Sequence, residues 1–170
     1  KNSKEIEQQI NNLSVEENPI KSLYGDVPFG AGTPLSGPWT EIKDINPSMI
    51  GQTVTIRVRV HNTRATAKNC FLVVRQRYDY MQAVLFAQPA KADGSAPEIS
   101  RQMIKWCGQV PRESIVDLVG VLAGADVKSD LITQNKIELA ILQVHVVSRA
   151  QNTPPFSLDD AARPEEGTDA

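Results

Sequence analysis

The chain has 170 residues, 41% of them hydrophobic, and a formal net charge of −2 at pH 7. This length suits one domain with a hydrophobic core and extensions, and it leaves little room for two domains. The sequence contains no run of about 18 apolar residues and no charged-then-apolar start, so it predicts neither membrane insertion nor export, and a cytoplasmic location is the default.

Two cysteines, Cys70 and Cys107, and two histidines, His61 and His145, are the side chains to examine for a metal site. None of them has a companion at metal-ligand spacing, so we expect no metal. The cysteines are expected to be reduced, small apolar residues.

The first 38 residues are predicted to be an N-terminal extension. Residues 1–18 are polar, with a few apolar residues at helical spacing, and are expected to form a short helix or to stay mobile. Residues 19–38 are rich in proline and glycine, which is typical of a linker or of a segment draped over a domain.

Residues 39–150 carry the regular elements of the predicted domain. We expect strands at about 53–63, 69–77, 80–87, 114–122 and 138–148, with a helix within 98–110. A mostly β chain with five strands and a helix between the third and the fourth fits the Greek-key barrel of the OB-fold. Residues 151–170 are acidic and contain prolines, so they are predicted to be a weakly structured linker.

Two neighbouring strands are predicted to share a basic outer face. In 53–61 the even positions are apolar and the odd ones polar or basic; in 70–77 Cys70, Leu72 and Val74 alternate with Phe71, Val73, Arg75 and Arg77. A phenylalanine on a basic face loses hydrophobic burial, which indicates a partner with a π-face that covers it. Bases of single-stranded nucleic acid have such faces.

The charge distribution supports this interpretation. Between residues 51 and 90 one acidic residue, Asp79, stands against six basic ones: Arg57, Arg59, Arg64, Lys68, Arg75 and Arg77. A chain of net negative charge can still bind nucleic acid when its cations are concentrated in this way.

The same basic face also fits less specific roles. The chain's own N-terminal segment is an alternative cover for Phe71, and a row of arginines is also typical of a solvated sheet face. A sequence-tolerant single-strand binder and a protein-interaction domain whose exposed Phe71 docks a partner are the alternative functions.

Five segments together resemble a known family, the N-terminal anticodon-binding domain of eukaryotic cytoplasmic aspartyl-tRNA synthetase. They are VRVHNTRATAKNCFLVVRQ (58–76), QMIKW (102–106), ESIVDLVGV (113–121), TQNKIEL (133–139) and LDDAARPE (158–165). The resemblance covers about residues 35–166. The last segment resembles the hinge that leads into the catalytic domain.

The resemblance implies roles for individual residues. Phe71 matches the aromatic residue that stacks on the central uridine of the anticodon, Gln82 matches a glutamine that contacts anticodon bases, and Glu138 matches a glutamate that hydrogen-bonds a base edge. The basic positions of the motif, where backbone or base contacts are expected, are Arg64, Lys68 and Arg75.

One loop position departs from the family pattern. A serine seven residues before the matched glutamate is Leu131 in this chain. The RNA contact of this loop serine is then lost, made by the backbone, or taken over by Thr133.

The resemblance also implies a larger parent enzyme. This would be an aspartate–tRNA ligase of class II, a cytoplasmic homodimer that binds the anticodon loop of tRNA-Asp. ATP and Mg would bind in a catalytic domain that this fragment lacks, so we expect no cofactor and no aminoacylation here. The sequence has no GxxxxGK[ST], GxSxG or HExxH motif that would suggest another catalytic activity.

Overall fold

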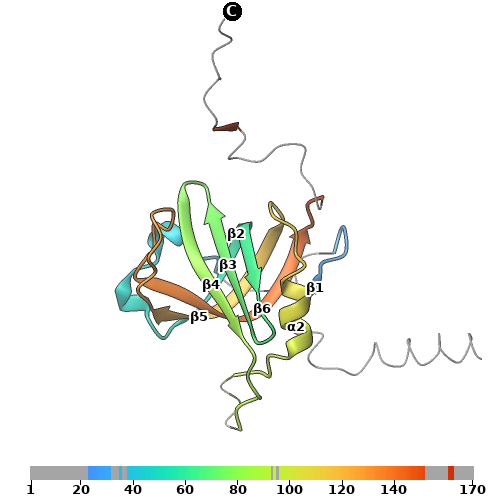
Figure 1. Cartoon of the computed structure of the whole chain (residues 1–170). Coiled ribbons are helices and arrows are strands. Elements are labelled where there is room, and N and C mark those ends of the chain that lie inside the picture. Colours follow the sequence, from blue (N-terminus) through green and yellow to red (C-terminus); the bar gives the residue numbers. More distant parts are fainter. Residues whose placement is uncertain are drawn as a thin grey trace, which may run out of the picture.

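The computed structural model describes residues 23–31, 35, 38–92, 94, 96–151 and 161–162. Its strands are β1 (Tyr24–Asp26), β2 (Thr53–Ala65), β3 (Asn69–Gln76), β4 (Asp79–Phe86), β5 (Ile115–Gly124) and β6 (Ile137–Ser148). One α-helix, α2 (Arg101–Cys107), and the 3-10 turns η2 (Ile42–Asp44) and η3 (Pro47–Met49) complete the described elements (Figure 1).

Strands β2 to β6 close into a barrel. The strand order is β1-β6-β4-β3-β2-β5, and an additional pairing of β6 with β5 closes the ring. All neighbouring barrel strands are antiparallel except β4 and β6, which are parallel. The predicted mostly β, five-stranded OB-fold barrel with a helix between its third and fourth strands is therefore confirmed.

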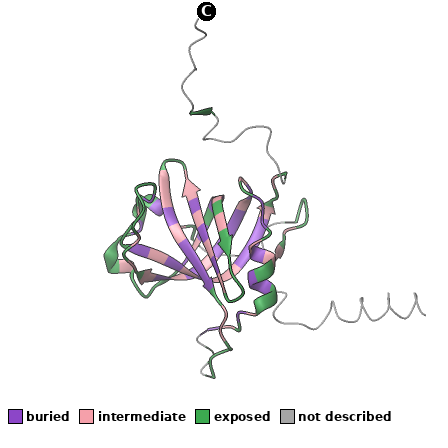
Figure 2. Cartoon of the chain, in the orientation of Figure 1, coloured by how far each residue is buried: buried purple, intermediate pink, exposed green. Residues whose placement is uncertain are grey.

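The core forms because apolar residues alternate along each strand, so that one side of the sheet faces the barrel interior. Figure 2 shows this as buried and partly exposed residues alternating along the strands. Val54, Ile56, Val58 and Val60 of β2 are all buried, as the alternation predicted. Helix α2 packs against β2 and β3, and its N-cap Ser100 accepts a hydrogen bond from the Met103 backbone N–H at 3.1 Å.

A bulge in β2 departs from simple alternation. The pairing of β2 with β3 shifts between Val60 and Asn62, so that Val60 pairs with Val74 and Asn62 with Val73. His61 is the extra residue, and after it Asn62 and Arg64 lie on the outer face while Thr63 pairs with the buried Leu72. An even-numbered residue, Arg64, thereby reaches the basic face.

Arg77 does not lie on a strand, contrary to the alternation. Strand β3 ends at Gln76, and Arg77 has a φ of 57° in the turn before β4. Arg77 is exposed there, and it does not extend the row formed by Phe71, Val73 and Arg75.

Part of the N-terminal extension is a strand. Residues Tyr24–Asp26 pair in parallel with Val144–Val146 of β6, and Asp26 forms an ion pair with Arg149 at 2.7 Å. The short helix predicted within 1–18 and most of the linker at 151–170 lie outside the described residues. No helix in the described part of the chain is long and apolar enough to cross a membrane.

Candidate nucleic-acid interface

The outward side chains of β2, β3, β4 and the start of β6 form one surface, which we call the outer face. Its first cross-strand row consists of Arg64, Phe71, Val84 and Ala140. The next row consists of Asn62, Val73, Gln82 and Glu138, and a third of Arg59, Arg75 and Tyr80. Neighbouring strands lie about 4.8 Å apart, so residues within a row are in contact range.

The outer face brings together five of the seven residues singled out from the sequence: Arg64, Phe71, Arg75, Gln82 and Glu138. The other two lie at its ends. Lys68 is in the turn between β2 and β3, and Thr133 is in the loop between β5 and β6.

Phe71 lies near one end of the outer face, with Arg64 beside it on β2 and Val84 beside it on β4. The ring is partly exposed. It contacts the ring of Phe86 edge to face, with the centroids 6.0 Å apart and an angle of 86° between the ring planes. Such a pair fixes the ring orientation and leaves aromatic surface open to solvent.

Gln82 and Glu138 are paired residues on parallel strands, and their side chains are joined. Gln82 Nε2 donates a hydrogen bond to Glu138 Oε2 at 2.8 Å. This bond leaves the Gln82 carbonyl oxygen, one Gln82 N–H and the second Glu138 oxygen for a ligand. The pair therefore offers a donor and acceptors side by side, which suits the edge of a base.

Several arginines of the basic segment are neutralised by acidic residues that come from elsewhere in the chain. Arg75 Nη2 lies 2.7 Å from Glu113 Oε2, and its side chain is only 18% exposed. Arg59 Nη1 lies 3.6 Å from the same carboxylate oxygen. These two arginines therefore contribute less free positive charge than the sequence suggested.

Arg57, two residues before Arg59 on β2, is also bound to a carboxylate. Its Nε and Nη2 donate to the two carboxylate oxygens of the buried Asp117, at 2.7 and 2.9 Å. The hydrogen bond to Asp117 raises the pKa of the Arg57 guanidinium. The same guanidinium lies 4.8 Å from the centroid of the Trp39 ring.

Arg64 and Lys68 are exposed, and neither has an ion-pair partner within the described part of the chain. They flank Phe71, Arg64 through its cross-strand pair and Lys68 from the turn just before β3. These two cations remain available for phosphate.

Thr133 fastens the loop between β5 and β6 to the start of β4. Its hydroxyl accepts a hydrogen bond from Tyr80 N at 2.9 Å and donates one to Tyr80 O at 3.1 Å. The Gln134 N–H also donates to Tyr80 O, at 3.0 Å. Leu131, in place of the family serine, is 43% exposed.

Three aromatic residues of the outer face were not singled out from the sequence: His61, Tyr80 and Phe86. Tyr80 and Phe86 share the period of two with Gln82 along β4, and that alternation was the available signal. His61, the bulge residue, contacts Tyr80 edge to face with centroids 5.3 Å apart. The alternation in 53–61 already placed His61 among the outward odd positions, whereas the bulge at His61 required knowledge of the strand pairing.

Comparison with known proteins finds relatives in sequence and in structure. No family model matches the chain. The cytoplasmic aspartate–tRNA ligase of Bos taurus is 39% identical over 124 residues, which cover 73% of this chain and 23% of the relative. The human cytoplasmic enzyme is 37% identical over the same length. The chain is homologous to cytoplasmic aspartyl-tRNA synthetases.

The homologous region is a limited part of those enzymes, since this chain spans about a quarter of the length of the curated relatives it matches. A structure described as an aspartyl-tRNA synthetase from Leishmania major superposes with a TM-score of 0.74 at 29% identity, covering 86% of this chain and 28% of that one. The aspartyl-tRNA synthetase of Entamoeba histolytica gives 0.66 at 28% identity, covering 75% and 25%. Both sequence and fold therefore agree with the resemblance to aspartyl-tRNA synthetase.

Proposed function

We propose that this chain is the tRNA anticodon-recognition module of a cytoplasmic aspartate–tRNA ligase and that it binds the anticodon loop of tRNA-Asp. Homology to cytoplasmic aspartyl-tRNA synthetases and the OB-fold barrel support anticodon recognition. The observation that carries the proposal is the joined pair Gln82 and Glu138 next to Phe71 on the outer face.

The geometry suits a base that is splayed out of the anticodon loop. Gln82 pairs with Val73, two residues along β3 from Phe71, so Gln82 and Phe71 are diagonal neighbours about 7–8 Å apart. A base that stacks on the Phe71 ring can then turn its edge toward Gln82 and Glu138. The imino N–H of a uracil would donate to the Glu138 carboxylate, and a uracil carbonyl would accept from the free Gln82 N–H.

Phosphate contacts are assigned to the cations that have no ion-pair partner in the described ranges. Arg64 and Lys68 flank Phe71 and would neutralise the backbone of the bound loop. Arg75, held by Glu113, would mainly keep the outer face in position. Thr133 would act by holding the loop between β5 and β6 against β4.

The activity of the parent protein is part of this proposal. Its remaining length would supply a class II catalytic domain that binds ATP and Mg and charges tRNA-Asp with aspartate. We propose a cytoplasmic homodimer for the parent. The module alone would bind tRNA without aminoacylating it.

Replacement of Phe71 by alanine tests the proposal. We expect Phe71→Ala to weaken binding of a tRNA-Asp anticodon stem-loop by about 1–3 kcal/mol in a fluorescence titration, because one stacked base is lost. Tyr78→Ala is the matched control, since Tyr78 is an aromatic residue that is 91% exposed in the turn between β3 and β4. Unchanged affinity of Phe71→Ala, with the fold intact by circular dichroism, would contradict the proposal.

A further inference from the structure

A hollow of about 240 Å³ lies on the outside of the barrel, beyond the Gln82 and Glu138 pair. Its apolar walls come from β4, β5 and β6, and include Val84, Phe86, Val121, Ala140 and Leu142. The volume lies below the range of about 300–1,000 Å³ that is usual for sites of drug-sized ligands. A group of the size of one base is therefore a better match than a larger ligand.

The hollow continues the outer face along the same two strands. Gln82 pairs with Glu138, and two residues further on Val84 pairs with Ala140, both of which line the hollow. Two residues along a strand correspond to about 6.6 Å. A polynucleotide whose one base meets Gln82 and Glu138 can thus place the next base in the hollow.

Phe86 supplies an aromatic wall at this position. It is 45% exposed, although a phenylalanine side chain gains most when it is buried. Its ring plane makes an angle of 86° with that of Phe71, so one base cannot stack on both rings. The two rings instead suit two bases whose planes are strongly inclined to each other, as in a splayed single strand.

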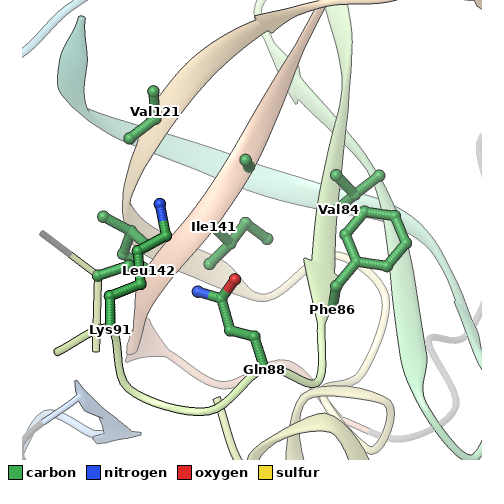
Figure 3. A pocket seen from close by; sticks show the side chains of 9 residues that line it. Val84, Phe86, Gln88, Lys91, Val121, Ile141 and Leu142 are labelled. Carbon is green, nitrogen blue, oxygen red and sulfur yellow. The ribbon is translucent and has the colours of Figure 1, made fainter. Parts of the chain in front are cut away.

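The mouth of the hollow carries polar groups that fit a nucleotide. Figure 3 shows the Gln88 side chain pointing from the loop after β4 toward Ile141, the Lys91 side chain rising beside Leu142, and the Phe86 ring on the opposite side. Backbone hydrogen bonds hold this loop: Gln88 N donates to Ile99 O at 3.1 Å, and Lys91 N donates to Ala96 O at 3.0 Å. Among the described residues, no carboxylate lines the hollow.

We propose that this hollow is a second base-binding site, in which Phe86 stacks on the nucleotide adjacent to the one read by Gln82 and Glu138. The Gln88 amide, with two donors and one acceptor, reads the edge of that base, and the Lys91 ammonium binds its phosphate. This inference rests on the proposed function, because it takes the ligand to be a single-stranded RNA loop. It extends recognition from one base to two successive bases.

The test uses the whole 170-residue chain and a set of tRNA-Asp anticodon stem-loops in which each loop base is removed in turn. We expect Phe86→Ala to weaken binding of the intact stem-loop by about five- to 150-fold. Removal of the base next to the one read by Gln82 should weaken binding to the unmodified chain, but should have little further effect on Phe86→Ala. Phe86→Leu, which keeps an apolar side chain without a ring, should show most of the same loss.

The salt dependence of binding provides a second test. Lys91→Ala should reduce the slope of log K against log[salt] by about 1, because one phosphate contact is removed. Tyr78 is an exposed aromatic residue in the turn that precedes β4, at the end of the strand away from Phe86. Tyr78→Ala should therefore change neither the affinity nor the salt slope.

The outcomes separate this inference from the proposed function. If the unmodified chain binds the stem-loop and Phe71→Ala weakens binding, while Phe86→Ala binds within about twofold of the unmodified chain, the second site is refuted and the function stands. If the unmodified chain does not bind the stem-loop, the proposed function fails first. Unchanged RNA affinity, together with self-association that Phe86→Ala abolishes in analytical ultracentrifugation, would instead assign the hollow to a second copy of the chain.

Discussion

The cations near Phe71 divide into two kinds at the scale of single residues. Arg75 is largely buried and bound to Glu113, whereas Arg64 and Lys68 are exposed and have no ion-pair partner in the described ranges. An exposed, unpaired cation can release counterions from RNA, while a paired one has already lost most of that capacity. The first kind should therefore act on stability and the second on binding.

Substitution of Arg64 and Arg75 by alanine tests this division. We expect Arg64→Ala to reduce the salt slope of anticodon stem-loop binding by about 1 and to change the free energy of unfolding by less than about 0.5 kcal/mol. Arg75→Ala should lower the free energy of unfolding by about 1.5–3 kcal/mol, because a charged hydrogen bond is lost and Glu113 is left with a weaker partner. Urea unfolding measures the free energy of unfolding, and titrations at several salt concentrations measure the salt slope. If the two variants lost equal stability, the distinction between a structural Arg75 and an RNA-binding Arg64 would be contradicted.

The sequence predicted which residues lie on this face better than it predicted what they contact. The alternation placed Phe71 and Arg75 outward because a strand turns every second side chain to the same side. The partners Glu113 and Asp117 come from the region of β5, and a charge count over residues 51–90 cannot include them. The bond between Gln82 and Glu138 likewise depends on the parallel pairing of β4 with β6.

At the scale of elements, the close approach of β5 and β6 positions the strand that carries Glu138. A side-chain carbon at Gly120 would lie near Ala140 O and 2.8 Å from Leu139 Cγ. The backbone of β6 therefore packs directly on this glycine, and the pairing shifts register next to it, between Val119 and Gly120. Any side chain here must displace β6 close to Glu138.

Gly120→Ala is predicted to destabilise the barrel by about 1–3 kcal/mol through overpacking. Gly124→Ala is the matched control on the same strand, because its added carbon would meet only Ile50 Cδ1, at 3.7 Å, among the described residues. Thermal unfolding of both variants measures the difference. A Gly120→Ala variant as stable as Gly124→Ala would contradict the role given to this contact.

Strands and helices could be predicted from the sequence where the periodicity of a single segment determines them. The five barrel strands and α2 lie close to the ranges expected from periodicity, because alternation and helical spacing are properties of a single segment. The bulge at His61 and the turn position of Arg77 were not predicted, since a bulge exists only with respect to a partner strand. Strand β1 is only three residues long and gave no periodic signal.

At the scale of the whole molecule, a buried polar group links the barrel to the N-terminal strand. His145 pairs with Asp117 on β5 and with Gly25 on β1, and Asp117 is bound to Arg57 on β2. Burial lowers the pKa of His145 below its usual 6.5, although the Asp117 charge acts in the opposite direction. The folded chain therefore holds this histidine neutral at pH values where the unfolded chain protonates it.

The free energy of unfolding should consequently fall as the pH is lowered below 6.5, by up to about 1.4 kcal/mol per pH unit for this one group. The unfolded state binds the extra proton in that window, so acid favours unfolding. His145→Gln should flatten this dependence in urea unfolding between about pH 6.5 and 5.5, because the group whose pKa is lowered by burial is then absent. If the free energy of unfolding of His145→Gln depended on pH as steeply as that of the unmodified chain, His145 would not be the source of the pH dependence.

In the function proposed above, Gln82 and Glu138 of the outer face would read the anticodon bases. The most direct measurement is the ratio of affinities for the tRNA-Asp anticodon stem-loop and for the same loop with its central uridine changed. We predict that the unmodified chain prefers the cognate loop and that Gln82→Ala and Glu138→Ala each narrow the ratio, because a base edge loses its partner. Equal affinity of the unmodified chain for both loops, or an equal loss for both in the two variants, would contradict base readout by this pair.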